Sequence, residues 1–277
     1  MTYNELWREL APLSGDGEAK AIVRTLLDDL FHMSLADIVC GAVERLGEKD
    51  EALLRDAMQR LQDGEPVQYV TGCAPFMNRT FHVAPGVLIP RPETEQLCRI
   101  AVEKASLAPR AAVLDIGTGS GCIAATMALD SPDAAVEAWD ISPDALRIAA
   151  DNAQRLGAAV AFRQQDALQA PPDKDRWDVI VSNPPYICHS EAGEMERNVL
   201  SHEPHTALFV PDDDPLLFYR AIARYASAAL RRGGWLLFEI NPLYARQTGE
   251  MLRHAGFEDI TTMKDIFGKE RNTICRR

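Results

Sequence analysis

The stretch that decides the fold of this chain reads Val113-Leu114-Asp115-Ile116-Gly117-Thr118-Gly119-Ser120-Gly121. An apolar segment over 111–116 ends here in a glycine-rich turn, and a helical pattern follows over 121–129. Beyond this point apolar strand candidates alternate with helical patterns. Such alternation predicts a mostly parallel sheet of the α/β class, with helices covering both of its faces.

The alternation yields a definite set of expected elements. Five strands are expected at 111–116, 135–140, 159–163, 177–182 and 234–240, with helices at 121–129, 143–156, 215–232 and 243–255. Two more strands, near 258–264 and 271–276, are separated by a turn around Gly268, which indicates an antiparallel hairpin at the sheet edge. The sheet should therefore have seven strands, and the stretch 183–214 is expected to be a long loop.

The first 65 residues show a different pattern. Apolar side chains recur there at helical spacing, for example at Leu6 and Leu10 and again at Leu54 and Met58. Nothing in this segment suggests catalysis. We therefore expect a separate helical domain over 1–65.

Between 66 and 90 the period changes to that of strands. Residues 67–72 and 80–83 alternate apolar and polar side chains, which predicts a β-hairpin, and Pro85-Gly86 marks a turn. We interpret 66–90 as a hairpin linker between the helical domain and a main domain over 91–277.

Composition narrows the class of protein. The formal net charge is −12, from 29 basic and 41 acidic residues, which argues against direct binding of nucleic acid because phosphate affinity rests on clustered Lys and Arg. The six cysteines form no CxxC pair, so no metal site is expected and reduced cytoplasmic thiols fit. No apolar run approaches the roughly 18 residues that span a membrane. We expect a cytoplasmic protein whose substrate is a protein or a small molecule.

The glycine turn predicts a site for a nucleotide-like cofactor at a helix N-terminus. A dinucleotide-binding fingerprint would place its third glycine three residues after the second, which the spacing here does not. A carboxylate at Asp115 would repel a pyrophosphate but would favour an ammonium or sulfonium group. The expected cofactor-binding residues of this turn are Asp115, Gly117, Thr118, Gly119 and Gly121.

Two further acids follow the next two expected strands. Asp140 ends the second strand, where its carboxylate can accept both hydroxyls of a ribose. The other interpretation, a helix N-cap, is weaker because Ser142 already fills that role. Asp166 follows the third strand, and there two interpretations stay open: a contact to an adenine amine, or a plain turn aspartate.

The tetrapeptide Asn183-Pro184-Pro185-Tyr186 follows the fourth strand. The two prolines stiffen the backbone, so that the Pro184 carbonyl can point into a pocket beside the side-chain oxygen of Asn183. Two acceptors at one spot can bind both hydrogens of an NH2 group, and Tyr186 offers a flat face to a planar amide or base. These four residues are the expected catalytic residues, and Asn183 is expected to border the cofactor as well.

Such acceptors address a chemical difficulty. An amide or aryl-amine nitrogen is a poor nucleophile because its lone pair is delocalised. Acceptors aimed at its hydrogens stabilise the positive charge that gathers on nitrogen during attack on a sulfonium methyl group. The pattern therefore predicts methyl transfer onto an amide or exocyclic amine, with no strong general base required.

These motifs resemble those of the peptide chain release factor glutamine N5-methyltransferases (the PrmC/HemK family). The glycine turn, Asp140 and the tetrapeptide fit the general class I pattern. The discriminating stretches are 64–72 (GEPVQYVTG) and 87–95 (VLIPRPETE), which look like the signature linker of the family. Glu203-Pro204 and the ending Gly268-x-x-Arg271 are also similar to the family.

The resemblance implies a class I, Rossmann-like methyltransferase fold with a small helical domain for substrate recognition. It implies S-adenosylmethionine as cofactor, S-adenosylhomocysteine as product, and methylation of the glutamine in the Gly-Gly-Gln motif of class I release factors. Independently of the resemblance, we expect a monomer. Asn183 and the Pro184 carbonyl would bind the target amide, Gly117 and Gly119 the methionine end of the cofactor, and Asp140 its ribose. It also places the segment 91–94 near the active site.

Three other functions compete with this one. An N-methyltransferase acting on exocyclic amines of rRNA, tRNA or DNA bases shares the tetrapeptide, although the acidic charge and the 64–95 stretch count against it. A NAD-type oxidoreductase is disfavoured by the glycine spacing. A silent binding module is disfavoured by the intact tetrapeptide.

Overall fold

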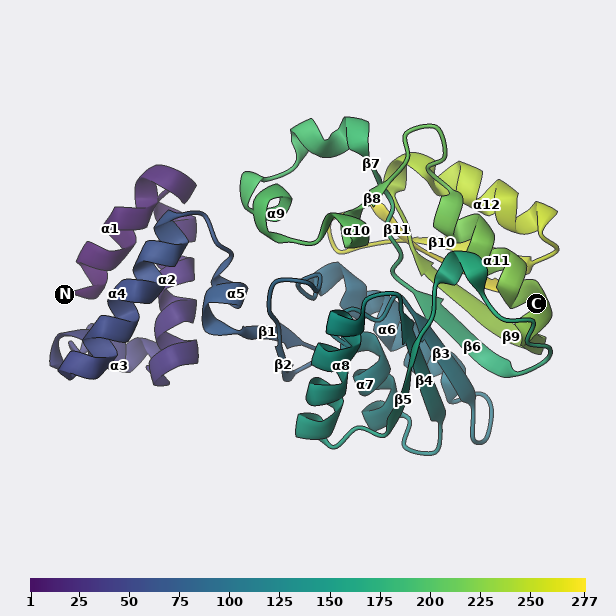
Figure 1. Cartoon of the computed structure of the whole chain (residues 1–277), viewed down its shortest axis with the longest axis horizontal. Coiled ribbons are helices and arrows are strands. Elements are labelled where there is room, and N and C mark those ends of the chain that lie inside the picture. Colours follow the sequence, from purple (N-terminus) through teal and green to yellow (C-terminus); the bar gives the residue numbers. More distant parts are fainter. The chain divides into compact units, whose positions relative to one another are not determined.

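The computed structural model describes residues 1–277. The chain forms two compact units (Figure 1). The smaller unit comprises Met1–Cys73, Val83–Pro85 and Glu196–His202, and the larger comprises Ala74–His82, Gly86–Met195 and Glu203–Arg277. Every helix is too short or too polar to cross a membrane.

The smaller unit is helical, as the sequence predicts. The first helix begins at a capping box, in which Thr2 Oγ1 accepts from the Glu5 amide and the Glu5 carboxylate accepts from the Thr2 amide. Apolar side chains at helical spacing, Leu6, Leu10 and Leu54 among them, pack into one core. Its elements are α1 (Tyr3–Ser14), α2 (Asp16–Phe31), α3 (Leu35–Val39), the 3-10 helix η1 (Val43–Arg45), α4 (Glu48–Gln62), α5 (Val67–Thr71) and α9 (Arg197–His202).

The strand predicted over 67–72 is wrong, because this segment is the helix α5 (Val67–Thr71). Gly72 ends the helix with φ of 73°, in the left-handed conformation that glycine adopts most easily. Tyr69 and Val70 are both buried although they are neighbours in sequence. Adjacent buried residues fit a helical turn and not a strand with alternating faces.

The hairpin of the linker region lies further along the chain. Strands β1 (Cys73–Phe76) and β2 (Arg79–His82) pair with each other. Met77 and Asn78 connect them with φ of 49° and 58°, the positive values that a two-residue hairpin turn requires. A hairpin is therefore present, but its first strand begins after the segment that the sequence indicated.

The larger unit contains the seven-stranded sheet, in the order β10-β11-β9-β6-β3-β4-β5. The strands from β9 to β5 run parallel, and β11 and β10 add an antiparallel edge, so the predicted sheet is confirmed. The strands are β3 (Ala112–Ile116), β4 (Ala135–Asp140), β5 (Val160–Gln164), β6 (Trp177–Ser182), β9 (Leu230–Glu239), β10 (Glu258–Lys264) and β11 (Glu270–Arg276).

Helices cover both faces of this sheet (Figure 1). One apolar core joins alternate strand residues such as Val113 and Val179 to α6 and α7, and α8 packs at the β4 and β5 end. A second core joins Leu114 and Ile180 to α11 and α12. Sequence neighbours thus enter opposite cores, as the two-residue period of a strand requires. The helices are α6 (Pro92–Ala105), α7 (Cys122–Asp130), α8 (Pro143–Leu156), α11 (Leu217–Ala229) and α12 (Ala245–His254).

The stretch 183–214, expected to be a loop, contains several short elements. Strands β7 (Ile187–Cys188) and β8 (Phe209–Val210) pair in parallel. In the sequence between them come the 3-10 helix η3 (His189–Glu194), α9, which belongs to the smaller unit, and α10 (His205–Leu208). Each element is too short to show a period in sequence. Long-range contacts stabilise the β7–β8 pair. An example is the hydrogen bond that the Tyr186 amide donates to the Leu208 carbonyl.

Candidate active site

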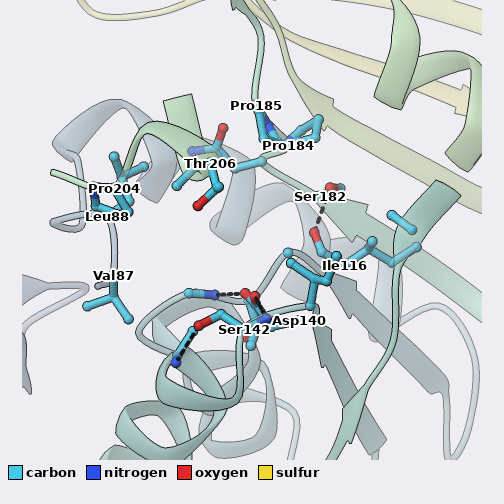
Figure 2. A pocket seen from close by; sticks show the side chains of 18 of the residues that line it. Val87, Leu88, Ile116, Asp140, Ser142, Ser182, Pro184, Pro185, Pro204 and Thr206 are labelled. Atoms are coloured by element: carbon cyan, nitrogen blue, oxygen red, sulfur yellow. Dashed lines mark hydrogen bonds between the residues drawn. The ribbon is translucent and has the colours of Figure 1, made fainter. Parts of the chain in front are cut away.

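A cavity of about 380 Å³ lies at the carboxyl ends of the parallel strands of the larger unit (Figure 2). Pockets that hold small ligands have volumes of about 300–1,000 Å³. In open parallel sheets such pockets form where neighbouring strands connect in opposite directions, which here is between β3 and β6. The wall is formed by residues 86–91, Thr94, 116–120, Cys122, Ile123, 140–142, Ala145, 165–168, 182–185, Pro204, Thr206, Ala207, Phe209, Phe218 and Ile222.

The glycine turn and Asp140 form one side of this cavity. Asp140 Oδ2 accepts from the Gly119 amide at 2.9 Å, and its Oδ1 accepts from the Ser142 amide at 2.9 Å. Burial raises the pKa of Asp140, and these backbone hydrogen bonds oppose the rise. Ser142 caps α8 by accepting from the Ala145 amide, as expected. Asp140 is therefore a fixed acceptor beside the turn and not a helix cap.

The glycines of the turn have different surroundings. A Cβ at Gly119 would meet nothing within 4 Å, and one at Gly117 would lie 3.9 Å from the backbone oxygen of Asn183. Side chains at these positions would therefore occupy space beside the cavity that both residues line. Gly121 does not line the cavity, and a Cβ there would lie 2.9 Å from the Ala149 Cβ on α8. Gly121 is thus required for packing between α7 and α8.

Asp115 lies beneath the turn and is fully buried. Its Oδ2 accepts from Thr118 Oγ1 at 2.6 Å, and the Ala124 backbone amide also interacts with the carboxyl group. Burial raises the pKa of Asp115 to about 7, while the Thr118 hydrogen bond opposes the rise. Thr118 lines the cavity and Asp115 does not, so the predicted contact between Asp115 and a cationic ligand stays a prediction.

Asp166 lines the cavity next to β5. Its Oδ1 accepts from the Leu168 amide at 2.8 Å, and its Oδ2 accepts from Gln169 Nε2 at 3.0 Å. The side chain therefore caps the 3-10 helix η2 (Ala167–Gln169). This arrangement fits the turn interpretation of Asp166, and the adenine contact stays a prediction.

The tetrapeptide forms the facing side. Ser182 Oγ donates to the Ile116 carbonyl at 2.6 Å, which joins the end of β6 to the end of β3 (Figure 2). Asn183, Pro184 and Pro185 then line the cavity together with the glycine turn. The sequence motifs that suggested a reacting site and a cofactor site therefore meet in one cavity.

Tyr186 departs from the position expected for it. Its ring is not part of the cavity wall, and its hydroxyl donates to Glu239 Oε1 at 3.0 Å. Burial, together with the nearby Glu239 carboxyl, raises the pKa of Tyr186 above its ordinary value. The predicted contact between its ring and a planar substrate stays a prediction.

Two residues next to Asn183 have contacts that the sequence does not indicate: Glu239, and Thr94 of the segment 91–94. Thr94 Oγ1 donates to Glu239 Oε2 at 2.6 Å and accepts from Asn183 Nδ2 at 3.3 Å. Glu239, at the end of β9, is 2% exposed, and burial raises its pKa against the opposing effects of its hydrogen bonds and of Arg271. In the sequence, the signal for Glu239 is an acidic residue at the end of an apolar strand. Nothing in the sequence indicates that it contacts Thr94.

The segment before α6 is fixed by a second buried acid. Glu203 Oε1 accepts from Arg91 at 2.5 Å, and its Oε2 accepts from the Ile89 amide at 3.1 Å. Arg91 and Thr94 both line the cavity, in agreement with the placement implied for 91–94. Glu203 thereby holds together two parts of the cavity wall that are far apart in sequence.

The residues present fit a nucleoside cofactor with a methionine-like tail. The wall supplies an acceptor at Asp140, unobstructed glycines at 117 and 119, and an apolar patch that includes Ile141 and Leu168. No group of three or more His, Cys, Asp or Glu side chains comes together in a way that could hold a metal ion.

The sheet order, the glycine turn, the acid after β4 and the tetrapeptide after β6 together define a class I methyltransferase. A methyltransferase structure from Pyrococcus furiosus shares this fold, with a TM-score of 0.51 and 19% identity over 71% of this chain and 87% of that one. Residues 80–203 match the family described as the methyltransferase small domain, and residues 8–72 match the PrmC N-terminal domain.

Comparison with whole proteins identifies one family within this class of methyltransferases. The release factor glutamine methyltransferase of Bacteroides thetaiotaomicron is 47% identical, over 94% of this chain and 93% of its own length. That of Streptococcus pneumoniae is 36% identical, over 93% of this chain and 92% of its own length. The chain belongs to the release factor glutamine methyltransferase family, which confirms the resemblance read from its motifs.

Proposed function

We propose that this protein transfers a methyl group from S-adenosylmethionine to the side-chain amide nitrogen, N5, of the glutamine in the Gly-Gly-Gln motif of class I release factors. The proposal draws its substrate from the names of the family relatives and its chemistry from the cavity. One observation carries it: Asn183, Pro184 and Pro185 line the same cavity as the glycine turn, and a Cβ at Gly117 would lie 3.9 Å from the Asn183 backbone oxygen.

The cofactor side of the cavity has defined tasks in this proposal. S-adenosylmethionine, when bound, supplies a methyl group made electrophilic by its sulfonium. Asp140 accepts from the ribose hydroxyls, since its oxygens are already oriented by the Gly119 and Ser142 amides. Gly117 and Gly119 leave room for the methionine end, and Thr118 covers Asp115 beneath them.

The acceptor side orients the substrate. Asn183 Oδ1 and the Pro184 carbonyl accept from the two hydrogens of the glutamine amide, which turns its lone pair toward the methyl group. With the cofactor bound, the N–CH3 bond would form as the sulfonium S–CH3 bond breaks, and S-adenosylhomocysteine would be the leaving group. Both acceptors would stabilise the positive charge on nitrogen until one of its protons passes to solvent. Pro185 keeps the backbone stiff at this point. No carboxylate or imidazole is required to deprotonate the amide first.

The remaining parts of the chain are assigned by the same proposal. The helical domain over 1–65 recognises the release factor, the hairpin region over 66–90 links it to the methyltransferase domain over 91–277, and the enzyme acts as a monomer in the cytoplasm. The PrmC N-terminal domain match over 8–72 supports a distinct role for the helical part.

A transfer assay tests the proposal. Purified protein, labelled S-adenosylmethionine and a class I release factor are incubated together, and the Gly-Gly-Gln peptide is analysed by mass spectrometry. We expect one methyl group on the glutamine, no label on a release factor whose glutamine is replaced by alanine, and transfer by Asn183→Ala that is slower by about 10³-fold. Label that appears in total RNA and not in the release factor would favour methylation of nucleic acid instead.

A further inference from the structure

The side chain of Asn183 has two chemically different ends. Its Oδ1 accepts hydrogen bonds and its Nδ2 donates them, yet the two ends are nearly identical in shape. If Nδ2 faced the cavity, it would meet the NH2 group of a substrate amide donor to donor. Binding of that amide by Asn183 therefore requires that something in the structure determine which end faces the cavity.

Thr94 is the hydrogen-bond partner of the Nδ2 end, at 3.3 Å. A hydroxyl alone does not determine this orientation, because it can donate to Oδ1 as readily as it accepts from Nδ2. It has only one proton, however, and Thr94 donates that proton to Glu239 Oε2 at 2.6 Å. With its proton committed, Thr94 Oγ1 can only accept from Asn183.

Glu239 is the group that orients this chain of hydrogen bonds. An ionised carboxylate accepts and never donates. Tyr186 donates to its other oxygen, Oε1, at 3.0 Å, so each carboxylate oxygen accepts a hydrogen bond from a neighbouring hydroxyl. Thr94 and Glu239 are 3% and 2% exposed, so water does not readily replace either partner.

Resting on the proposed function, we propose that Thr94 and Glu239 are positioning residues, which fix the Asn183 amide with its oxygen toward the substrate. Neither touches the reacting atoms. They act through Asn183, and the carboxylate of Glu239 sets the direction of every hydrogen bond in the chain.

The surroundings of Glu239 support this role. Burial raises the pKa of Glu239, whereas the Thr94 and Tyr186 hydrogen bonds and the Arg271 charge lower it, and Glu93 raises it further. Tyr219 donates to the Glu239 backbone carbonyl and not to its carboxyl. Protonated Glu239 could donate to Thr94, and the direction of the chain would then be lost. Transfer should therefore be lost on the acid side at a higher pH than an ordinary glutamate would give.

Substitution of Thr94 tests the proposal, with each variant measured in the same methyl-transfer assay as wild type. Thr94→Val removes the hydroxyl and keeps the shape. It should lower kcat by about 30-fold, less than the roughly 10²–10³-fold loss found when a preorganised group that contacts the reacting atoms is removed. Thr94→Ser keeps the hydroxyl and should stay within about threefold of wild type. The Kd for S-adenosylmethionine should be unchanged in both. Thr126→Val is the matched control, because Thr126 is buried on α7 and its hydroxyl has no partner.

The pattern among these variants decides the outcome. Unchanged kcat in Thr94→Val would overturn the proposal, and so would Thr94→Ser that falls as far as Thr94→Val. An equal loss in Thr126→Val would attribute the effect to general core damage and would also overturn it. Glu239→Gln should lower kcat as Thr94→Val does, and it should remove the shifted acid limb of the pH profile.

A second measurement does not depend on the substrate. In protein labelled with 15N-asparagine, the Asn183 side-chain resonance is assigned by its absence in Asn183→Ala. We expect that resonance to shift in Thr94→Val and Glu239→Gln and to stay in place in Thr126→Val. If wild type does not methylate the release factor, the proposed function is wrong. The positioning role of Thr94 and Glu239 is then tested by the Asn183 resonance alone. An unchanged resonance in Thr94→Val would reject it.

Discussion

The two sides of the cavity are built in different ways. On the glycine side, the contact between Gly119 and Asp140 joins residues 21 apart in sequence, and that between Asp140 and Ser142 joins residues two apart. On the acceptor side, the bond between Asn183 and Thr94 joins residues 89 apart, and that between Thr94 and Glu239 joins residues 145 apart. One side is local to a single β-α-β unit, and the other is assembled from three distant segments.

Because the two sides are built differently, we expect them to control different properties of the enzyme: cofactor affinity on the glycine side and kcat on the acceptor side. The glycine side offers a fixed carboxylate at Asp140 and unobstructed glycines at 117 and 119, all from one short stretch of the chain. The acceptor side holds the direction of one amide, which matters only when a substrate reacts. Damage to the glycine side should therefore appear in cofactor affinity or stability, and damage to the acceptor side in kcat.

The largest effect is expected from Asn183→Ala. Loss of the acceptor that stabilises charge on the substrate nitrogen should lower kcat by about 10³-fold, the upper range for one preorganised donor or acceptor. Calorimetric titration should give a Kd for S-adenosylmethionine within severalfold of wild type. A variant that loses cofactor binding to the same extent as kcat would erase the distinction between the two sides.

Asp140→Ala should show the opposite behaviour. Loss of charged hydrogen bonds to the ribose and of the bond to the Gly119 amide should raise the Kd for S-adenosylmethionine by about 100-fold. At saturating cofactor, kcat should recover most of its wild-type value. Asp133→Ala is the matched control, since Asp133 is exposed in the loop before β4. Normal affinity in Asp140→Ala would refute the ribose assignment.

A pair of glycine variants separates packing from binding. Gly121 and Gly119 both have positive φ, 80° and 55°, so alanine is strained at either position. Only at Gly121 would the new Cβ also meet Ala149, at 2.9 Å. Gly121→Ala should cost about 2–3 kcal/mol of stability, since overpacking adds to backbone strain. Compared with Gly121→Ala, Gly119→Ala should lower the stability less and the affinity for the cofactor more. Thermal melts and cofactor titrations of both variants measure the two effects.

The pH dependence of stability should report on Asp115. Its folded pKa, about 7, lies above the ordinary aspartate value of 3.8. Between these values the folded chain keeps a proton that the unfolded chain has lost, so stability falls as the pH rises. Between pH 5.5 and 8, wild type should lose about 2 kcal/mol relative to Asp115→Asn. Denaturant unfolding of both proteins at several pH values measures this. A difference in free energy of unfolding that stays constant between pH 5.5 and 8 would contradict the prediction.

Local patterns made the glycine side predictable. The apolar strand, the turn that follows it and Asp140 each lie within one short segment, and the structure brings them together as expected. The same holds for Asn183, Pro184 and Pro185 at the end of β6, though not for Tyr186, and for the order of strands and helices around them.

Residues whose roles depend on tertiary contacts were not predictable. Thr94 reads as an ordinary residue in the first turn of a helix, and Glu239 as the end of a strand, until the fold places them 2.6 Å apart. Tyr186 lies in a recognisable motif, but its hydroxyl is bonded to Glu239 and not free in the cavity. The helix over Val67–Thr71 was mistaken for a strand because an alternating pattern of this length also fits one helical turn.

The most direct test of the central claim is a crystal structure of the protein with S-adenosylhomocysteine and a peptide that contains Gly-Gly-Gln. The account predicts that the glutamine amide nitrogen lies about 3 Å from both Asn183 Oδ1 and the Pro184 carbonyl oxygen, with the ribose on Asp140. An amide bound elsewhere in the cavity, or a ribose away from Asp140, would contradict it.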